Sequence, residues 1–200
     1  MDNIYITIGR EFGSGGREIG KKLAQALNIP YYDKELLAVA AEESGLSHEF
    51  LKNYDEKPTN SFLYSLVMGQ HGLFSNGYDT VEQLAANAQR DAVLAVADKG
   101  SCVIVGRCAD YILRDRPGLF RVFVTASMNA RIYRICKRDG LTTEEAEEKI
   151  RQMDRTRSSY YSFHTDRDWG AASSYDLCVS SSLKGVDGAV ETILTFLRAK

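Results

Sequence analysis

An apolar run, a glycine-rich loop and an amphipathic stretch follow one another directly near the start of the chain. The run spans residues 5–8, and residues 19–27 carry apolar side chains at helical spacing. The loop between them contains four small residues: Gly13, Ser14, Gly15 and Gly16. Glycines let the backbone curl so that amide groups point at a phosphate, and the first turn of a helix adds free amides and partial positive charge. The segment predicts a phosphate-binding loop.

Arg17 lies at the mouth of the predicted helix, where a P-loop places its cation. The standard pattern ends in Gly-Lys-Ser/Thr, whereas Gly16 and Arg17 are followed here by Glu18. Because no hydroxyl follows the cation, the usual Mg²⁺ ligand is missing. Ser14 is one substitute, and waters together with Asp33 are another.

Two other interpretations of the loop remain open. One is a strand-to-helix turn that binds no ligand. The other is a dinucleotide-binding turn of a nicotinamide-dependent oxidoreductase, with Asp33 holding a ribose. That fingerprint requires Gly-x-Gly-x-x-Gly, and Glu18 stands at the place of the third glycine.

Five short apolar runs, bounded by Gly, Pro, Asp and Ser, predict strands. They span residues 5–8, 29–32, 101–105, 120–124 and 175–179. Helices are predicted over residues 80–99, from a capping box at Thr142 and Glu145 toward Ser158, and from residue 186 or 187 onward. Alternating strands and helices predict right-handed crossovers. The expected fold is a single α/β domain over residues 1–200, of the three-layer P-loop NTPase type with a five-stranded parallel sheet.

Composition restricts the class of protein. The chain has 200 residues, 44% of them hydrophobic and 26% charged, which is typical of a globular enzyme. The net charge of −2 provides no overall field for nucleic acid or an anionic membrane. No signal peptide or membrane-spanning run is visible, and the four cysteines form no Cys-x-x-Cys pair. We expect a cytoplasmic monomer or homodimer with no nucleic-acid or membrane partner, no metal site at His48 or His71, and buried thiols at Cys102 and Cys178.

A phosphate-binding protein with this net charge must gather positive charge locally. Arg131, Arg134 and Arg138 share one face of a predicted helix, and the run Asp154-Arg155-Thr156-Arg157 lies on the next helix. These two helices predict a mobile, arginine-rich lid over about residues 131–170. Arginine side chains stabilise a transferring phosphoryl group well, and a closed lid excludes water. The alternative is a solvated helix face balanced by neighbouring glutamates.

A second glycine-arginine pair, Gly106-Arg107, ends the third predicted strand. In open α/β sheets, ligands bind beyond the carboxyl ends of the strands. Arg107 is therefore expected at the functional edge. The alternative is an ion pair with Asp110 one turn later.

These motifs, in this order, resemble the cytidylate kinase-like family. The resemblance includes the loop at residues 12–19, the Val105-Gly106-Arg107 turn, the run at residues 154–157 and the strand at residues 175–179. It implies a nucleoside-monophosphate-kinase fold with the lid and a helical acceptor-binding insertion at about residues 34–80. It also implies transfer of the γ-phosphoryl group of ATP, with Mg²⁺, to a nucleoside monophosphate, most directly CMP or dCMP.

The same resemblance assigns roles to residues. It implies that the ATP-binding residues are Gly13, Ser14, Gly15, Gly16, Arg17 and Arg131. It implies that the acceptor-binding residues are Asp33, Arg107, Asp154 and Arg157. The implied catalytic residues are Arg17, Arg155 and Arg157.

The chain also departs from true cytidylate kinases. These carry lysine at the place of Arg17, an acidic residue at the place of Cys108, and a Tyr-Arg pair soon after the second strand, where residues 32–36 contain no arginine. Two alternatives therefore remain. One is a kinase of another small-molecule acceptor. The other is a non-catalytic or regulatory nucleotide-binding protein that kept the fold.

Overall fold

The computed structural model describes residues 3–33, 36 and 81–199. Most of the predicted acceptor-binding insertion at about residues 34–80 lies outside the described residues. The same is true of His48 and His71.

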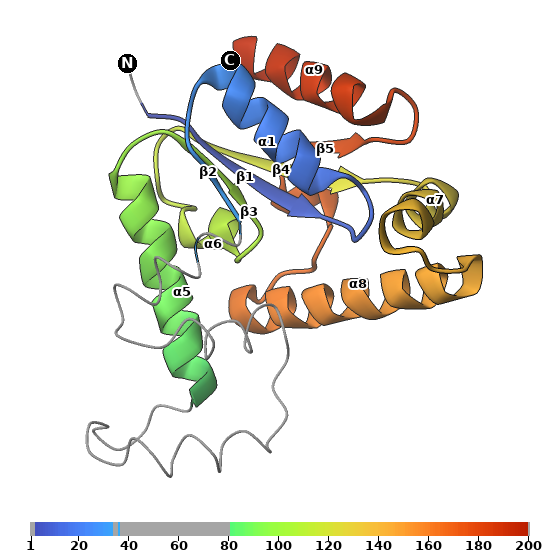
Figure 1. The fold of residues 1–200 in the computed structure, drawn as a ribbon. Helices are drawn as coiled ribbons and strands as arrows, with labels where there is room; N and C mark the ends of the chain where they lie inside the picture. Colours follow the sequence, from blue (N-terminus) through green and yellow to red (C-terminus); the bar gives the residue numbers. More distant parts are fainter. Residues whose placement is uncertain (1–2, 34–35, 37–80, 200) are drawn as a thin grey trace.

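Five parallel strands form one sheet in the order β2-β3-β1-β4-β5 (Figure 1). The strands are β1 (Tyr5–Arg10), β2 (Tyr31–Tyr32), β3 (Cys102–Val105), β4 (Leu119–Thr125) and β5 (Leu177–Ser180). The central strand is β1, in which Ile8 is in register with Val105 of β3 and Val122 of β4. All carboxyl ends therefore face one edge, and the glycine-rich loop leaves from its middle. This confirms the predicted five-stranded parallel sheet.

Helices cover both faces of the sheet (Figure 1). One face packs against α1 (Gly16–Leu27) and α9 (Gly185–Arg198), and the other against α5 (Val81–Asp98) and the short α6 (Ala109–Ile112). Beyond the carboxyl ends lies a hairpin of α7 (Met128–Asp139) and α8 (Thr143–Thr165), and a 3₁₀ helix (Ala172–Ser174) precedes β5. None of the described helices has the length and apolar character needed to cross a bilayer.

Side chains of β1 alternate between the two faces. Ile6 and Ile8 are fully buried in the core beneath α1 and α9, whereas Tyr5 belongs to the core beneath α5 and α6. Successive side chains of a strand point to opposite faces. Arg10, the last residue of β1, continues the series of Ile6 and Ile8, so its side chain leaves the sheet on the α1 side.

Several boundaries differ from the predicted ones. β1 extends two residues further because Gly9 and Arg10 remain in register with β4. α8 extends past Ser158 to Thr165 because its last turns are buried: Tyr161 packs inside, and the Thr165 hydroxyl donates to the Tyr161 carbonyl at 2.7 Å.

The predicted burial of Cys178 is wrong. Its thiol is free and exposed, because β5 is an edge strand whose buried residue, Val179, faces α9. Cys102 is buried as predicted, and burial raises the pKa of its thiol to about 11.

The predicted capping box is confirmed at the start of α8. Glu145 donates its amide to the Thr142 hydroxyl at 3.3 Å, and Thr142 donates its amide to the Glu145 carboxylate at 2.8 Å. We expect Thr142→Ala to lower the free energy of unfolding by about 1 kcal/mol, measured by urea denaturation. Thr143→Ala removes an exposed neighbouring hydroxyl and is the matched control, with an expected change below about 0.5 kcal/mol. Equal losses in the two variants would contradict the role of the cap.

Candidate active site

Two glycines of the loop adopt a conformation that other residues rarely adopt. Gly13 has φ 80° and Gly15 has φ 86°, and Gly15 is the N-cap of α1. A Cβ atom on Gly13 would lie 3.1 Å from Ile135 Cγ1, and one on Gly15 would lie 3.0 Å from Val186 Cγ2. Both positions therefore require glycine for backbone conformation and for space.

The loop carbonyls are all held by hydrogen bonds. Arg157 Nη1 donates to the carbonyl of Arg10 at 3.2 Å, and Ser14 Oγ donates to that of Glu11 at 2.8 Å. Arg131 Nε donates to the carbonyl of Phe12 at 2.8 Å, Arg134 Nη1 to that of Gly13, and Ser181 Oγ to that of Ser14 at 2.6 Å. Within the described part of the chain, the amides of Gly13 and Gly15 make no hydrogen bond. The first amides of α1 have no intrahelical acceptor either. Such a loop offers its amides to an anion.

The helices of the predicted lid, α7 and α8, contact the loop through a largely buried ion pair. Asp154 of α8 accepts the Phe12 amide at 2.7 Å through Oδ1 and pairs with Arg131 of α7 through Oδ2. Arg131 is 5% exposed in its side chain and also lies 3.3 Å from a Glu11 carboxylate oxygen. The Phe12 ring packs into the small core between the two helices, with Ile135, Ala146 and Ile150. The hairpin is thus a support for the loop.

Ser14, the predicted substitute for the missing Mg²⁺ ligand, and the nearby carboxylate of Glu11 both make hydrogen bonds within the protein. The Glu11 carboxylate accepts the Thr125 hydroxyl at 2.5 Å and the Ala126 amide at 2.9 Å. The Ser14 hydroxyl is fully buried and donates to the Glu11 carbonyl. Among the residues that the structure describes, no group of three or more His, Cys, Asp and Glu side chains is arranged to hold a metal.

Arg17 and Asp33, which the sequence assigns to different ligands, lie together. Arg17 Nε is 2.6 Å from Asp33 Oδ2, and their side chains are 45% and 7% exposed, respectively. The Arg17 guanidinium is therefore directed along the side of α1 toward the end of β2.

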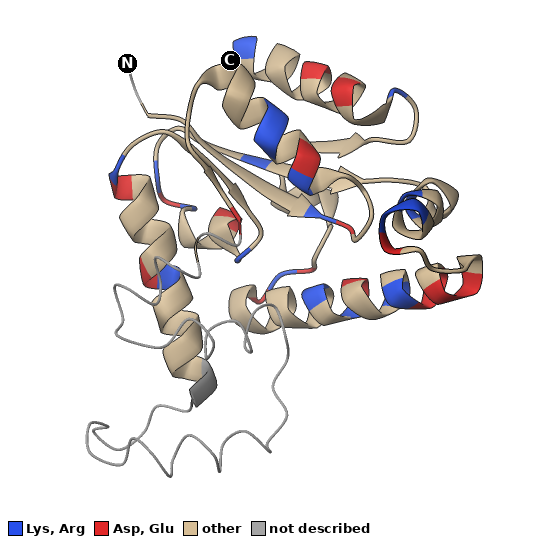
Figure 2. Ribbon diagram, in the orientation of Figure 1, with Lys and Arg blue, Asp and Glu red and all other residues tan. Residues whose placement is uncertain are grey.

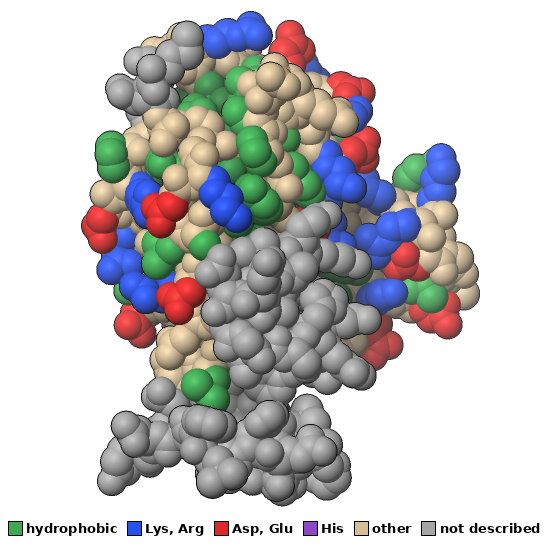
Figure 3. Space-filling model, turned by 60° about the vertical axis from the view of Figure 1, so that its left-hand side comes forward, with side chains coloured by type: hydrophobic (Ala, Val, Ile, Leu, Met, Phe, Trp, Pro, Cys, Tyr) green, Lys and Arg blue, Asp and Glu red, His purple; other side chains and the backbone are tan. Residues whose placement is uncertain are grey.

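A large open cavity lies over the loop, and we call it the loop cavity. It has a volume of about 890 Å³, within the range of small-molecule sites. Its lining includes the loop, Arg17 and Glu18 of α1, the Ser181–Ser182 turn, and three basic residues of α7: Arg134, Lys137 and Arg138. Basic residues recur along α7 and α8 (Figure 2), and several Lys and Arg side chains lie close together on the right-hand side of the space-filling view, with acidic side chains among them (Figure 3). The local positive charge that the net charge required is thus present.

Two smaller hollows follow the loop cavity: one adjoins it, and the second adjoins the first. The central hollow lies at the ends of β1 and β3 and includes Arg107, Asp110 and Trp169 in its lining. The α5 hollow lies between α5, α6 and α8, and its lining includes Asn87, Gln89, Arg90, Tyr111 and His164. Arg10 and Arg157 line both the loop cavity and the central hollow, and Arg107 lines both the central hollow and the α5 hollow. Arginine side chains therefore lie between each neighbouring pair of the three, and the central hollow itself is small, with a volume of about 20 Å³.

The turn after β3 is strained. Gly106, Arg107 and Cys108 have φ values of 75°, 62° and 51°, respectively, and the latter two are left-handed although they are not glycines. Such conformations cost free energy and concentrate at functional sites. The strain lies at the carboxyl edge of the sheet and turns Arg107 into the two hollows.

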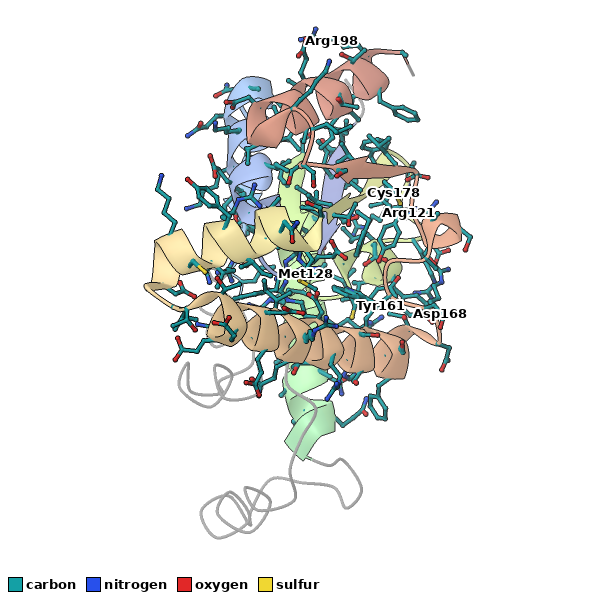
Figure 4. All side chains as sticks on the ribbon, turned by 90° about the vertical axis from the view of Figure 1, so that its right-hand side faces the viewer. Arg121, Met128, Tyr161, Asp168, Cys178 and Arg198 are labelled. Atoms are coloured by element: carbon teal, nitrogen blue, oxygen red, sulfur yellow. The ribbon has the colours of Figure 1, made fainter. Side chains whose placement is uncertain are left out.

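Asp110 is a buried carboxyl group beneath the central hollow. The Tyr161 hydroxyl donates to its Oδ2 at 2.6 Å, and Tyr161 lies on the face of α8 that is turned toward the sheet (Figure 4). Burial raises the pKa of Asp110, against the opposing effects of the Tyr161 hydrogen bond and the charges of Arg167 and Arg121. Burial and the nearby carboxylate raise the pKa of Tyr161 and Tyr175 as well.

The predicted site residues fall into two groups. Arg107, Arg157 and the loop glycines surround the hollows, whereas the charged groups of Arg131 and Asp154 bind each other and the loop. Arg155 is exposed and lines none of the three hollows. Sequence analysis assigned no role to Arg10, which lies between the apolar run at residues 5–8 and the loop glycines.

Comparisons with known proteins agree with this fold. The profile of the cytidylate kinase-like family matches residues 5–183. A cytidylate kinase of Pyrococcus horikoshii is 24% identical over 188 residues, covering 94% of this chain and 84% of the relative. A cytidylate kinase of Methanothrix thermoacetophila is 24% identical over 197 residues, covering 98% and 99% of the two chains.

Solved structures are similar over the whole chain. An uncharacterized protein from Eubacterium ventriosum has a TM-score of 0.74 and 33% identity, with each chain covered completely. The shikimate kinase of Bacteroides thetaiotaomicron has a TM-score of 0.56 and 15% identity, covering 98% of each chain. The latter likeness confirms the P-loop kinase fold.

The buried pair of Asp154 and Arg131 generates a stability prediction. Asp154→Ala removes the acceptor of the Phe12 amide and one of the two carboxylates beside the buried Arg131 guanidinium, so we expect a loss of about 3 kcal/mol in the free energy of unfolding, measured by urea denaturation. The double variant Asp154→Leu/Arg131→Met removes both charges but leaves the Phe12 amide and carbonyl without these partners, so it should recover part of that loss. Glu147→Ala breaks an exposed pair on the same helix and is the control, with an expected loss below about 1 kcal/mol. A double variant as unstable as Asp154→Ala would contradict this role of the Asp154–Arg131 ion pair.

The raised pKa of Asp110 generates a pH prediction. Because the folded pKa lies above the ordinary value of 3.8, the folded state binds this proton more tightly than the unfolded state. The contribution of Asp110 is complete below the unfolded pKa and is lost as pH rises through the folded pKa. Asp110→Asn keeps an acceptor for Tyr161 and does not titrate. We therefore expect its stability relative to the natural protein to rise from about pH 4 to about pH 7. A difference independent of pH in urea denaturation would contradict this.

Proposed function

The chain belongs to the cytidylate kinase-like family, and from this premise we propose that it transfers the γ-phosphoryl group of ATP to a nucleoside monophosphate, most directly CMP or dCMP. The observation that carries the proposal is the series of arginine side chains between the loop cavity, the central hollow and the α5 hollow. A donor and an acceptor that both carry phosphate need cationic groups on both sides of the point of transfer. These substrates are cytoplasmic, and we place the protein there as a monomer or homodimer.

We assign ATP to the loop cavity. The amides of Gly13 and Gly15 and the start of α1 suit the terminal phosphates of the nucleotide. Lys137 and Arg138 lie farther along the same cavity, where they suit the rest of the triphosphate. Arg131 acts on ATP indirectly in this proposal, because its guanidinium holds the Phe12 carbonyl and Asp154.

We assign the monophosphate acceptor to the central hollow and the α5 hollow. Arg107 joins these hollows and suits the acceptor phosphate. Amide side chains of Asn87 and Gln89 and the ring of Tyr111 suit hydrogen bonding and stacking with a base. Asp33, also predicted on the acceptor side, orients Arg17 in this proposal.

The proposed reaction needs positioning and charge stabilisation. An acceptor phosphate oxygen forms a bond to the γ-phosphorus while the bond to the β–γ bridging oxygen breaks, and ADP leaves. Arg157 stabilises the charge of the group in transfer because it lines the hollows on both sides. Arg155 remains a predicted lid residue whose contribution needs movement of α8.

Mg²⁺ bound together with ATP would supply positive charge beside the phosphate groups. In such sites it retains several waters and uses one or two carboxylates. Glu18 lines the loop cavity, and Asp33 lies beside Arg17, so these two carboxylates fit a water-mediated role.

A turnover assay tests the proposed reaction. ADP release from ATP and Mg²⁺ is measured against CMP, dCMP, UMP, AMP, GMP and shikimate, with the product identified by chromatography. We expect release that depends on CMP or dCMP and yields the corresponding diphosphate. Turnover of shikimate alone would assign another acceptor. ATP binding without turnover of any acceptor would favour the alternative of a non-catalytic or regulatory nucleotide-binding protein. The absence of the lysine and hydroxyl residues from the loop also supports that alternative.

Arg157→Met tests the residue between the loop cavity and the central hollow. The substitution keeps an unbranched apolar side chain and removes the guanidinium, whose carbon lies 5.4 Å from the centre of the Phe12 ring, so we expect kcat to fall about 100-fold. Arg151→Met, on the exposed side of α8, is the matched control and should leave kcat unchanged. Comparable kcat values in the two variants would argue against this role of Arg157.

A further inference from the structure

We propose that Arg10, at the end of β1, is the phosphate-binding cation of the loop, and that it replaces the lysine that a P-loop carries at the start of its helix. The inference rests on the proposed function, because it names the residue that contacts the transferring phosphoryl group of ATP. It assigns this role to a residue outside the glycine-rich segment.

The side chain of Arg10 fills the space beside Gly16. A Cβ atom on Gly16 would lie 2.6 Å from Arg10 Cβ and 3.0 Å from Arg10 Cγ. Real Cβ atoms do not approach so closely, so the stem of Arg10 occupies the place that a side chain at position 16 would take. A lysine at position 16 and an arginine at position 10 therefore exclude each other.

The loop pattern places the same two residues in correspondence. Because Gly15 is the N-cap of α1, it corresponds to the second glycine of Gly-x-x-x-x-Gly-Lys-Ser/Thr. Reading back five residues puts Arg10 at the first glycine, and reading forward one puts Gly16 at the lysine. The glycine and the cation have thus exchanged places in the sequence, and the stem of Arg10 fills the space beside position 16.

The surroundings of Arg10 fit phosphate transfer. Its side chain is buried and lines both the loop cavity and the central hollow, so it lies between the proposed donor and acceptor. Its backbone is held in register with Val124 of β4, and its carbonyl accepts a hydrogen bond from Arg157 Nη1 at 3.2 Å. A guanidinium on such an anchored strand end can bind phosphate oxygens through two parallel donors.

Arg17, the cation expected from the sequence, is placed differently. It pairs with the buried Asp33 at 2.6 Å on the flank of α1, and its side chain is 45% exposed. In the pattern read from Gly15, position 17 belongs to the Ser/Thr hydroxyl. The pair with Asp33 directs the Arg17 guanidinium toward the end of β2, while other parts of the residue line the loop cavity.

The test exchanges the two residues. ATP affinity is measured by calorimetry, and turnover is measured with the accepted monophosphate, for Arg10→Met, Arg10→Gly, Gly16→Lys and the double variant Arg10→Gly/Gly16→Lys. We expect each single variant to bind ATP about 10-fold or more weakly and to lose about 100-fold in kcat. The double variant should regain most of the ATP affinity, because lysine then has both the space and the place of the missing charge. Arg151→Met is the control for general effects of removing an arginine.

Three results would overturn the proposal. They are ATP affinity of Arg10→Met within about 3-fold of the natural protein, a double variant no better than Arg10→Gly, and a larger loss of ATP affinity in Arg17→Met than in Arg10→Met. If the natural protein binds ATP but turns over no acceptor, only the proposed reaction is contradicted, because the ATP affinities of the variants still test the role of Arg10. If the natural protein does not bind ATP, both the proposed reaction and the proposed role of Arg10 are contradicted. Unfolding temperatures without ATP show whether each variant is folded.

Discussion

The phosphate loop depends on hydrogen bonds to its carbonyl groups. Five successive carbonyls accept donors from α7, α8, the end of β5 and the loop itself, so the amides of Gly13 and Gly15 remain available to a ligand. A glycine-rich segment without these donors would have many conformations of similar energy. Three of the five donors are arginine side chains, so part of the positive charge near the loop has a structural use.

This support couples the loop to the α7–α8 hairpin. Arg131 and Asp154 join the two helices to each other and to Phe12, whose ring fills the core between them. A movement that separated the hairpin from the loop would leave the Phe12 amide and three loop carbonyls without their partners on α7 and α8, at a cost on the order of several kcal/mol. Closure over a nucleotide therefore has to proceed by bending within the hairpin or by moving it together with the loop.

Much of the fold could be predicted from the sequence, because strand alternation, glycines and the Thr142 capping box act over short distances. The family profile and the kinase-fold neighbours confirm the resemblance and the fold class. The pairing of Asp154 with the Phe12 amide could not be predicted, because it joins positions 142 residues apart through one side chain. The same holds for Arg10: its importance depends on the atoms that touch Gly16, and no spacing rule contains that contact.

The proposed exchange of cation and glycine also accounts for the character of position 17. With the phosphate-binding charge on the strand, the helix no longer has to present a lysine, and Arg17 can satisfy the buried carboxylate of Asp33 instead. A lysine on the helix is a flexible point charge, whereas an arginine on the central strand is a planar fork fixed by the sheet. The backbone that carries it is held by the register of β1 with β4 and by the hydrogen bond from Arg157 to the Arg10 carbonyl. The departure from the standard loop sequence therefore changes which element carries the charge while leaving the charge at the edge of the sheet where donor and acceptor meet.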